Sequence, residues 1–220
     1  MNVDFIDGAL ARLKVVPDSE AERLRKTEFE DPTSPKLRSL YRDAGLPLRH
    51  SSTESDFSGS EWVKTADGLK KRLGSGFLCA LIGTRGSGKT QLGVELAKAV
   101  ILAGKSARFA SATRFLMDIK ATYRKDATET ESGVLAFYAR PALLVIDELG
   151  RRGETDWEDR LLFELLNDRY NAVRDTILIS NHETVEKFGE AVGPSLVSRI
   201  NETGGVKVCN WPSFRETKTK

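Results

Sequence analysis

A loop of eight residues at positions 83–90 constrains the fold of this chain more than any other feature. It reads Gly-Thr-Arg-Gly-Ser-Gly-Lys-Thr and fits the pattern G-x-x-x-x-G-K-[ST] at every required position. The apolar run at residues 77–82 predicts a buried strand before it, and residues 91–102 carry apolar side chains at helical spacing after it. Glycines permit positive φ, so such a loop can turn its N–H groups toward phosphates at a helix N-terminus. A chance glycine-rich turn would not require a strand before it and a helix after it. We therefore predict a nucleoside triphosphate site.

Two side chains at the end of the loop have distinct expected roles. Lys89 is expected to contact the β- and γ-phosphates, and the Thr90 hydroxyl is expected to bind the Mg²⁺ ion that accompanies ATP. The predicted nucleotide-binding residues of the loop are Gly83, Thr84, Arg85, Gly86, Ser87, Gly88, Lys89 and Thr90.

A second apolar run, at residues 143–146, ends in the two carboxylates Asp147 and Glu148. Ligands of open α/β sheets bind at the carboxyl ends of the strands, which is where this pair falls. We predict that Asp147 binds the nucleotide and its Mg²⁺ ion, and that Glu148 orients or deprotonates the attacking water. The alternative is a pair that caps a helix.

Strand-like and helix-like segments alternate from residue 77 onward. The predicted strands cover residues 77–82, 107–110, 142–146, 176–180 and 206–209, and Thr155 with Glu158 forms a capping-box pair before a helix. This alternation predicts an α/β fold with a parallel five-stranded sheet between helices.

The composition limits the remaining possibilities. The 220 residues suffice for one core plus an arm, and a net charge of +2 leaves only local patches for nucleic acid. Cys79 and Cys209 lie in apolar runs, so we expect reduced core thiols and no zinc site. No apolar run is long enough to span a bilayer, and we expect a cytoplasmic protein without membrane contact.

The first 50 residues have a different sequence pattern from the rest, with short helical stretches broken by prolines. We expect a helical arm at 1–50 and the main domain at 51–220. Val3, Ile6, Leu10 and Leu13 form a narrow helical stripe that stops at Pro17. This stripe either packs on the main domain or binds a partner as a helix in a groove.

From about residue 46 the chain resembles the DnaC/DnaI-type replicative helicase loaders and the related IstB-type transposition ATPases, a branch of the AAA+ superfamily. The resemblance rests on residues 83–90, 144–150, 178–181, 198–200 and 209–215, the last reading Cys-Asn-Trp-Pro-Ser-Phe-Arg. It implies an AAA+ ATPase without a C-terminal lid domain, in a bacterial or phage setting. It also implies a DnaB-type helicase and single-stranded DNA as partners, with the helicase bound through the arm.

The resemblance also assigns two residues beyond the carboxylates. Asn181, after the strand at 176–180, is by itself as consistent with a turn as with a contact to the γ-phosphate or the attacking water. The resemblance places it at the sensor position and places Arg199 at the arginine finger, which acts on the nucleotide of a neighbouring subunit. Self-assembly through Arg199 would then be required for full hydrolysis. The alternative for Arg199 is a salt bridge on a helix surface.

Cations around an aromatic ring suit single-stranded DNA, because the charges follow the backbone and the ring stacks on bases. The first candidate group for contact with DNA is Arg114, Lys120, Tyr123, Arg124 and Lys125, and its alternative is a solvated helix face. The second candidate is the pair Arg151 and Arg152, which follows the carboxylates.

We therefore expect an ATP-dependent loader that binds a replicative helicase and single-stranded DNA during replication initiation, with hydrolysis controlling helicase release. A transposition helper would instead bind duplex DNA and a transposase. A small-molecule phosphotransferase would act as a monomer and would leave Arg199 and residues 210–215 unexplained. A nucleotide-gated binding module would use ATP only as a switch.

Overall fold

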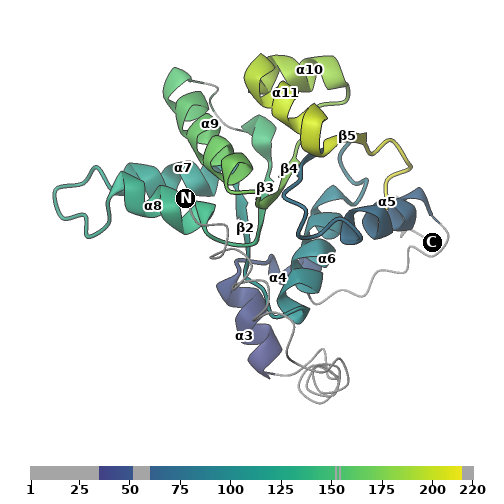
Figure 1. Ribbon diagram of the computed structural model, residues 1–220, viewed down its shortest axis with the longest axis horizontal. Helices are drawn as coiled ribbons and strands as arrows, with labels where there is room; N and C mark the ends of the chain where they lie inside the picture. Colours follow the sequence, from purple (N-terminus) through teal and green to yellow (C-terminus); the bar gives the residue numbers. More distant parts are fainter. Residues whose placement is uncertain (1–34, 52–59, 152, 154, 215–220) are drawn as a thin grey trace, which may run out of the picture. The chain divides into compact units, whose positions relative to one another are not determined.

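Figure 1 shows the computed structural model, which describes residues 35–51, 60–151, 153 and 155–214. Tyr41–Lys220 forms one compact unit, divided from Met1–Leu40. The expected helical stripe at residues 3–13 and the DNA candidate Arg152 lie outside the described residues. The described helices are α3 (Pro35–Asp43), α4 (Leu48–Ser51), α5 (Glu61–Lys70), α6 (Lys89–Leu102), α7 (Ala112–Ala121), α8 (Glu131–Ala139), the 3₁₀ helix η1 (Leu149–Arg151), α9 (Asp156–Asn171), α10 (Val185–Val192) and α11 (Pro194–Thr203).

The sheet has five strands: β1 (Leu78–Ile82), β2 (Ala107–Ser111), β3 (Leu143–Asp147), β4 (Asp175–Ile179) and β5 (Gly205–Val208). They are ordered β2-β3-β4-β1-β5, and every neighbouring pair is parallel, which confirms the predicted fold class. Because all strands run in one direction, their carboxyl ends share one edge of the sheet. The loop after β1, the carboxylates at the end of β3 and the polar residues after β4 therefore meet there.

Each face of the sheet is covered by its own set of helices (Figure 1). Ala80, Ile82, Ile146 and Leu178 belong to one buried cluster with residues of α7, α8, α9, α10 and α11. On the opposite face α6 packs on β2, β3 and β4. A Cβ at Gly93 of α6 would lie 3.0 Å from both the Val145 and Ile179 side chains, so glycine allows this helix to approach the sheet closely.

A buried arginine fixes the end of α8 to the sheet. Arg169 of α9 is fully buried and donates to the carbonyls of Ala139 and Pro141, each at 2.8 Å, and to Thr176 Oγ1 at 2.8 Å. Burial lowers its pKa to about 9, with the nearby Arg174 charge acting in the same direction. The sequence analysis placed no helix at Glu131–Ala139 and no role on Arg169.

The caps and thiols follow the sequence-based expectation. Thr155 caps α9, with its Oγ1 accepting from the Glu158 N–H at 3.3 Å. Cys79 and Cys209 are buried and free, and burial raises their pKa to about 11 and about 12, so both thiols are protonated at neutral pH. Within the described part of the chain, no helix has the length and apolar character needed to cross a membrane.

Candidate nucleotide-binding site

The predicted phosphate loop joins the carboxyl end of β1 to the first residue of α6. Gly83, Gly86 and Gly88 have φ values of 130°, 87° and 77°, a region that side chains with a Cβ rarely adopt. The Gly83 N–H donates to the His182 carbonyl at 2.8 Å, which ties the start of the loop to the segment after β4. Ser87 is fully buried inside the loop, whereas Thr84 and Arg85 are exposed at its tip.

Lys89 points its ammonium into the loop. Its Nζ donates to the carbonyls of Gly83 at 2.8 Å and Thr84 at 2.7 Å and lies 3.3 Å from Ser87 Oγ, and the residue is only 5% exposed. A buried cation held by neutral oxygens favours an anion beside it. The ammonium is therefore placed for the phosphates that the loop pattern predicts.

Thr90 and Asp147 are brought together from 57 residues apart. Thr90 Oγ1 donates to Asp147 Oδ2 at 2.8 Å, and the Glu148 N–H donates to Asp147 Oδ1 at 2.6 Å. Burial raises the pKa of the Asp147 carboxyl, while these two hydrogen bonds act in the opposite direction. A hydroxyl beside a carboxylate is the ligand set that proteins use for Mg²⁺ next to a nucleotide, so these residues fit the expected ion.

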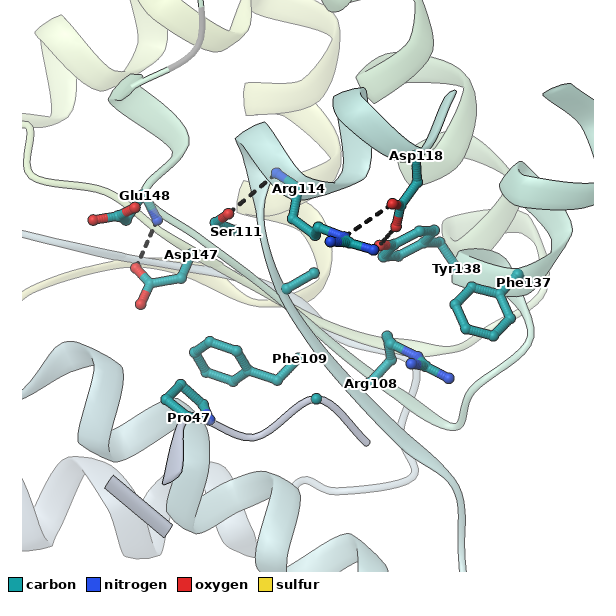
Figure 2. Close-up of a pocket in the computed structure, with 12 residues that line it drawn as sticks. Pro47, Arg108, Phe109, Ser111, Arg114, Asp118, Phe137, Tyr138, Asp147 and Glu148 are labelled. Atoms are coloured by element: carbon teal, nitrogen blue, oxygen red, sulfur yellow. Dashed lines mark hydrogen bonds and ion pairs between the residues drawn. The ribbon is translucent and has the colours of Figure 1, made fainter. Parts of the chain in front are cut away.

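Glu148 follows in a left-handed backbone conformation, with φ of 56°. Strained backbone of this kind is frequent at functional sites. Asp147 and Glu148 line one side of a 580 Å³ cavity at the carboxyl end of β2 and β3, as Figure 2 shows. The site thus places a second, half-buried carboxylate beside the candidate metal ligand.

The far wall of this cavity holds a polar cluster that the sequence analysis did not single out as a group. Asp118 pairs with Arg114 Nε at 2.9 Å and accepts from the Tyr138 hydroxyl at 2.7 Å (Figure 2). Arg108 lies over the Phe137 ring at 3.9 Å, and its buried Nε has no hydrogen-bond partner among the described residues. Burial lowers the pKa of the Arg108 guanidinium.

Asn181 lies level with the phosphate loop on the neighbouring strand. β4 pairs with β1, and the Ser180 N–H donates to the Leu81 carbonyl at 3.0 Å, so the residues after both strands end side by side. The Asn181 side chain is half-buried. His182, the next residue, has Nδ1 2.6 Å from Ser180 Oγ.

Arg199 lies on α11 and packs on a stripe of α9. Its Nη2 donates to Asn167 Oδ1 at 3.0 Å, its Nη1 donates to the Ser195 carbonyl at 2.9 Å, and the guanidinium lies 5.2 and 5.4 Å from the Phe163 and Tyr170 rings. These contacts hold the guanidinium through neutral groups.

The DNA candidates fall into two places. Arg114 is in the ion pair at the cavity, whereas Lys120 lies over the Trp157 ring at 5.1 Å, and Tyr123 accepts from Trp157 Nε1 at 3.2 Å. Arg124 and Lys125 are exposed in the turn between α7 and α8. The backbone of Arg151 belongs to η1.

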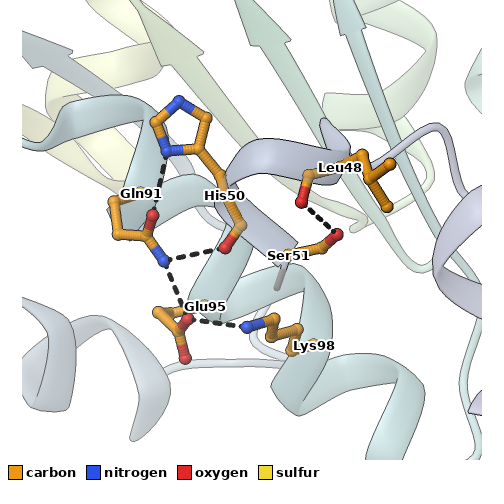
Figure 3. A network of polar contacts seen from close by, with 6 residues as sticks. All are labelled: Leu48, His50, Ser51, Gln91, Glu95 and Lys98. Carbon is orange, nitrogen blue, oxygen red and sulfur yellow. Dashed lines mark hydrogen bonds and ion pairs between the residues drawn. The ribbon is translucent and has the colours of Figure 1, made fainter. Parts of the chain in front are cut away.

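The segment that contains α4 contacts α6, the helix that follows the phosphate loop. His50 Nδ1 lies 2.9 Å from Gln91 Oε1, and Gln91 Nε2 donates to the His50 carbonyl at 3.1 Å and to Glu95 at 3.0 Å, as Figure 3 shows. Lys98 pairs with Glu95 at 3.1 Å. The contact of His50 with Gln91 spans 41 residues and leaves no local pattern in the sequence.

Residues 26–199 match the family described as IstB-like ATP binding protein. The chain belongs to this family. Among similar proteins is Rv3427c, an ATP-binding protein in an insertion sequence of Mycobacterium tuberculosis. It is 29% identical over 227 residues, and the match covers 98% of this chain and 89% of Rv3427c. The replicative helicase loader DnaC of Escherichia coli is 27% identical over 138 residues, covering 62% of this chain and 56% of DnaC. The chain thus spans little more than half the length of DnaC.

Solved structures show the same fold. A crystal structure of the DnaC helicase loader matches with a TM-score of 0.62 and 21% identity, covering 74% of this chain and 99% of that chain. AMPPCP-bound DnaA from Aquifex aeolicus matches with a TM-score of 0.62 and 18% identity, covering 76% of this chain and 51% of that chain. The chain therefore shares the fold of these two solved structures.

Proposed function

We propose that this protein is a Mg²⁺-dependent ATPase that binds single-stranded DNA and a DnaB-type replicative helicase, and that hydrolysis controls release of the helicase. The observation that carries the ATPase proposal is the 2.8 Å hydrogen bond from Thr90 Oγ1 to Asp147 Oδ2. This bond joins the phosphate loop to Asp147 at the end of β3, so the predicted phosphate-binding and metal-binding residues lie next to each other.

In the proposed mechanism each group has one task. Lys89 and the loop N–H groups would hold the β- and γ-phosphates. Thr90 and Asp147 would hold the Mg²⁺ ion, which would neutralise phosphate charge. Glu148 accepts the proton of the attacking water as that water forms its bond to the γ-phosphorus and the bond to the leaving ADP oxygen breaks. Asn181 orients this water or the γ-phosphate from the end of β4.

Arg199 completes the site of a neighbouring subunit in this proposal. Its guanidinium is a permanently charged planar fork, and the two hydrogen bonds and two rings that hold it are neutral. The charge is therefore positioned at the surface without neutralisation by these contacts. Assembly would bring it to the γ-phosphate, where it stabilises the charge that develops during hydrolysis.

Single-stranded DNA is proposed to bind at the turn between α7 and α8. Arg124 and Lys125 are exposed there, and Tyr123, 56% exposed, presents a ring for base stacking. Lys120 extends the positive charge along α7. Arg114 is a weaker candidate, because its charge is already paired with Asp118.

A transposition helper is the second candidate, and a specific observation favours it. The insertion-sequence relative covers 98% of this chain, whereas the DnaC match covers 62%. Such a helper would bind duplex DNA and a transposase. The solved DnaC loader, 99% of whose chain is matched here, supports the loader reading at the level of fold.

The experiment is co-elution of the full chain with a DnaB-type helicase, with and without ATP, followed by titration of fluorescent single-stranded and duplex DNA of equal length. The loader predicts an ATP-sensitive complex and preference for the single strand. Preference for duplex DNA together with no helicase complex would replace the loader with the helper. Helicase co-elution and DNA affinity that are both unchanged by ATP would contradict both candidate functions.

A further inference from the structure

The outer side of the phosphate loop is held by groups from two distant segments. Three consecutive loop carbonyls each accept a hydrogen bond from outside the loop: Gly86 from the Phe214 N–H at 3.0 Å, Ser87 from Trp211 Nε1 at 2.5 Å and Gly88 from Trp62 Nε1 at 3.0 Å. Trp62 belongs to α5, before β1, and Trp211 and Phe214 follow β5. We call these three donors the loop clamp.

Because of peptide-bond geometry, the loop clamp also orients the loop N–H groups that would donate to phosphates. A trans peptide group is planar, so its C=O and the N–H of the next residue point in opposite directions. Fixing the carbonyls of Gly86, Ser87 and Gly88 on the outer side therefore turns the N–H groups of Ser87, Gly88 and Lys89 toward the inner side. Inward N–H groups are what a phosphate-binding loop requires.

The clamp also acts at two glycines of the loop. Gly86 and Gly88 lack a Cβ, which widens the backbone conformations open to both. The Gly88 carbonyl also accepts from the Leu92 N–H of α6 at 2.9 Å, so the clamp adds to a restraint from the helix there. Both glycines are closely approached from the clamp segments: a Cβ at Gly88 would lie 2.9 Å from Trp62 Nε1 and 3.2 Å from the Phe214 ring, and one at Gly86 would collide with the hydroxyl of Ser213, the residue before Phe214. Contacts this close restrict the loop to one arrangement.

The clamp segments are themselves anchored. Trp62 is 6% exposed, and the Cys209 N–H donates to the Ile82 carbonyl at 2.7 Å, which continues the pairing of β5 with β1 up to the segment that carries Trp211. The clamp is thus fixed to the strand that leads into the loop.

We propose that Trp62 and Trp211 are positioning residues that preset the N–H groups of the phosphate loop, and so set the affinity for the di- and triphosphate of the nucleotide. This rests on the proposed nucleotide binding. It also gives a physical role to the segment at residues 209–214, which the proposed mechanism does not otherwise use.

The test replaces each indole by a ring that lacks the N–H donor. Trp62→Phe and Trp211→Phe each remove one hydrogen bond to the loop, and Trp157→Phe is the matched control, because its Nε1 donates to Tyr123 on the other face of the sheet. Isothermal titration with MgATP and MgADP, at a temperature where circular dichroism shows all variants folded, gives the dissociation constants. A net hydrogen bond corresponds to about 3–10-fold weaker binding for each clamp variant.

A kinetic comparison separates positioning from general destabilisation. KM for ATP should rise with the dissociation constant, and kcat at saturating ATP should stay within about 2-fold, because Lys89, Asp147 and Glu148 are unchanged. Phe214→Pro and Phe214→Ala are a second pair of variants, and both lose the phenyl ring. Only Phe214→Pro also loses the backbone N–H that donates to the Gly86 carbonyl. Weaker binding by the proline variant than by the alanine variant would support the clamp even where a tryptophan variant fails to fold.

The outcomes are distinguishable. A parent protein that binds neither nucleotide would overturn the proposed function itself. A parent that binds both, with clamp variants that match Trp157→Phe in affinity, would overturn the clamp and leave the function standing. A clamp variant that loses kcat at unchanged affinity would also contradict it.

Discussion

Replacing Arg199 by alanine tests whether its guanidinium acts on a neighbouring subunit or only holds α11 to α9. In its own subunit Arg199 makes two hydrogen bonds, at 2.9 and 3.0 Å, and lies over two aromatic rings. At about 1 kcal/mol for each hydrogen bond and about 0.5 kcal/mol for each cation–π contact, Arg199→Ala should lower the free energy of unfolding by about 2–3 kcal/mol. For a domain of this size the melting temperature should fall by about 4–12 °C.

The catalytic effect should be much larger than this loss of stability. An arginine finger accelerates hydrolysis by about 10³-fold or more, so Arg199→Ala should bind MgATP like the parent and lose most turnover in assembled protein. Asn167→Ala is the matched control, since it removes one hydrogen bond of Arg199 and keeps the guanidinium. Its stability should fall by about 1 kcal/mol and its turnover should stay within a few-fold of the parent.

The assay is steady-state ATP hydrolysis at several protein concentrations, with thermal unfolding measured in parallel. Mixtures of Arg199→Ala with Glu148→Gln should recover part of the activity, because each variant supplies what the other lacks. Equal loss of turnover in Arg199→Ala and Asn167→Ala, or parental ATP hydrolysis by Arg199→Ala, would show that Arg199 does not act on a neighbouring subunit.

Three further outcomes follow from the described contacts. Burial raises the pKa of Asp147, so its charge opposes folding at neutral pH and not below the pKa of the unfolded chain; in calorimetry of the nucleotide-free proteins, the melting temperature of Asp147→Asn relative to the parent should therefore increase as pH rises from about 3 to 7, while Mg²⁺-dependent ATP binding is lost. Replacing Lys120, Arg124 and Lys125 together by alanine should weaken single-strand binding and reduce its log–log salt slope by about 2 in fluorescence titrations. Gly93→Val should cost about 1–3 kcal/mol in denaturant unfolding, because the sheet lies 3.0 Å from a Cβ there.

The sheet and the loop were predictable because their determinants are local. The central strands β1, β3 and β4 contain short runs of apolar residues and are buried throughout, so composition alone marks them. The phosphate loop fits a pattern whose every position has a steric or chemical reason. Adjacency of Thr90 and Asp147 then follows, because both lie at the carboxyl edge of one parallel sheet.

The remaining features depend on contacts between distant segments. Trp62 and Trp211 approach the loop across 26 and 124 residues, and neither leaves a periodic signal in its own neighbourhood. Arg169 lies in a helix where an arginine ordinarily faces solvent, yet it is fully buried against carbonyls that only the fold brings together. Charge patterns alone also cannot show that Arg114 is paired with Asp118 while Arg124 is exposed.

Measuring MgATP binding and turnover for Glu148→Gln beside Lys89→Ala shows whether the loop and the carboxylates form one hydrolytic site. Glu148→Gln should bind MgATP within about 3-fold of the parent and lose at least about 100-fold in kcat, since an amide cannot accept the proton of water. Lys89→Ala should lose binding, because it removes the ammonium that lies inside the loop. Parental turnover by Glu148→Gln, or parental affinity in Lys89→Ala, would contradict the assignment of this site.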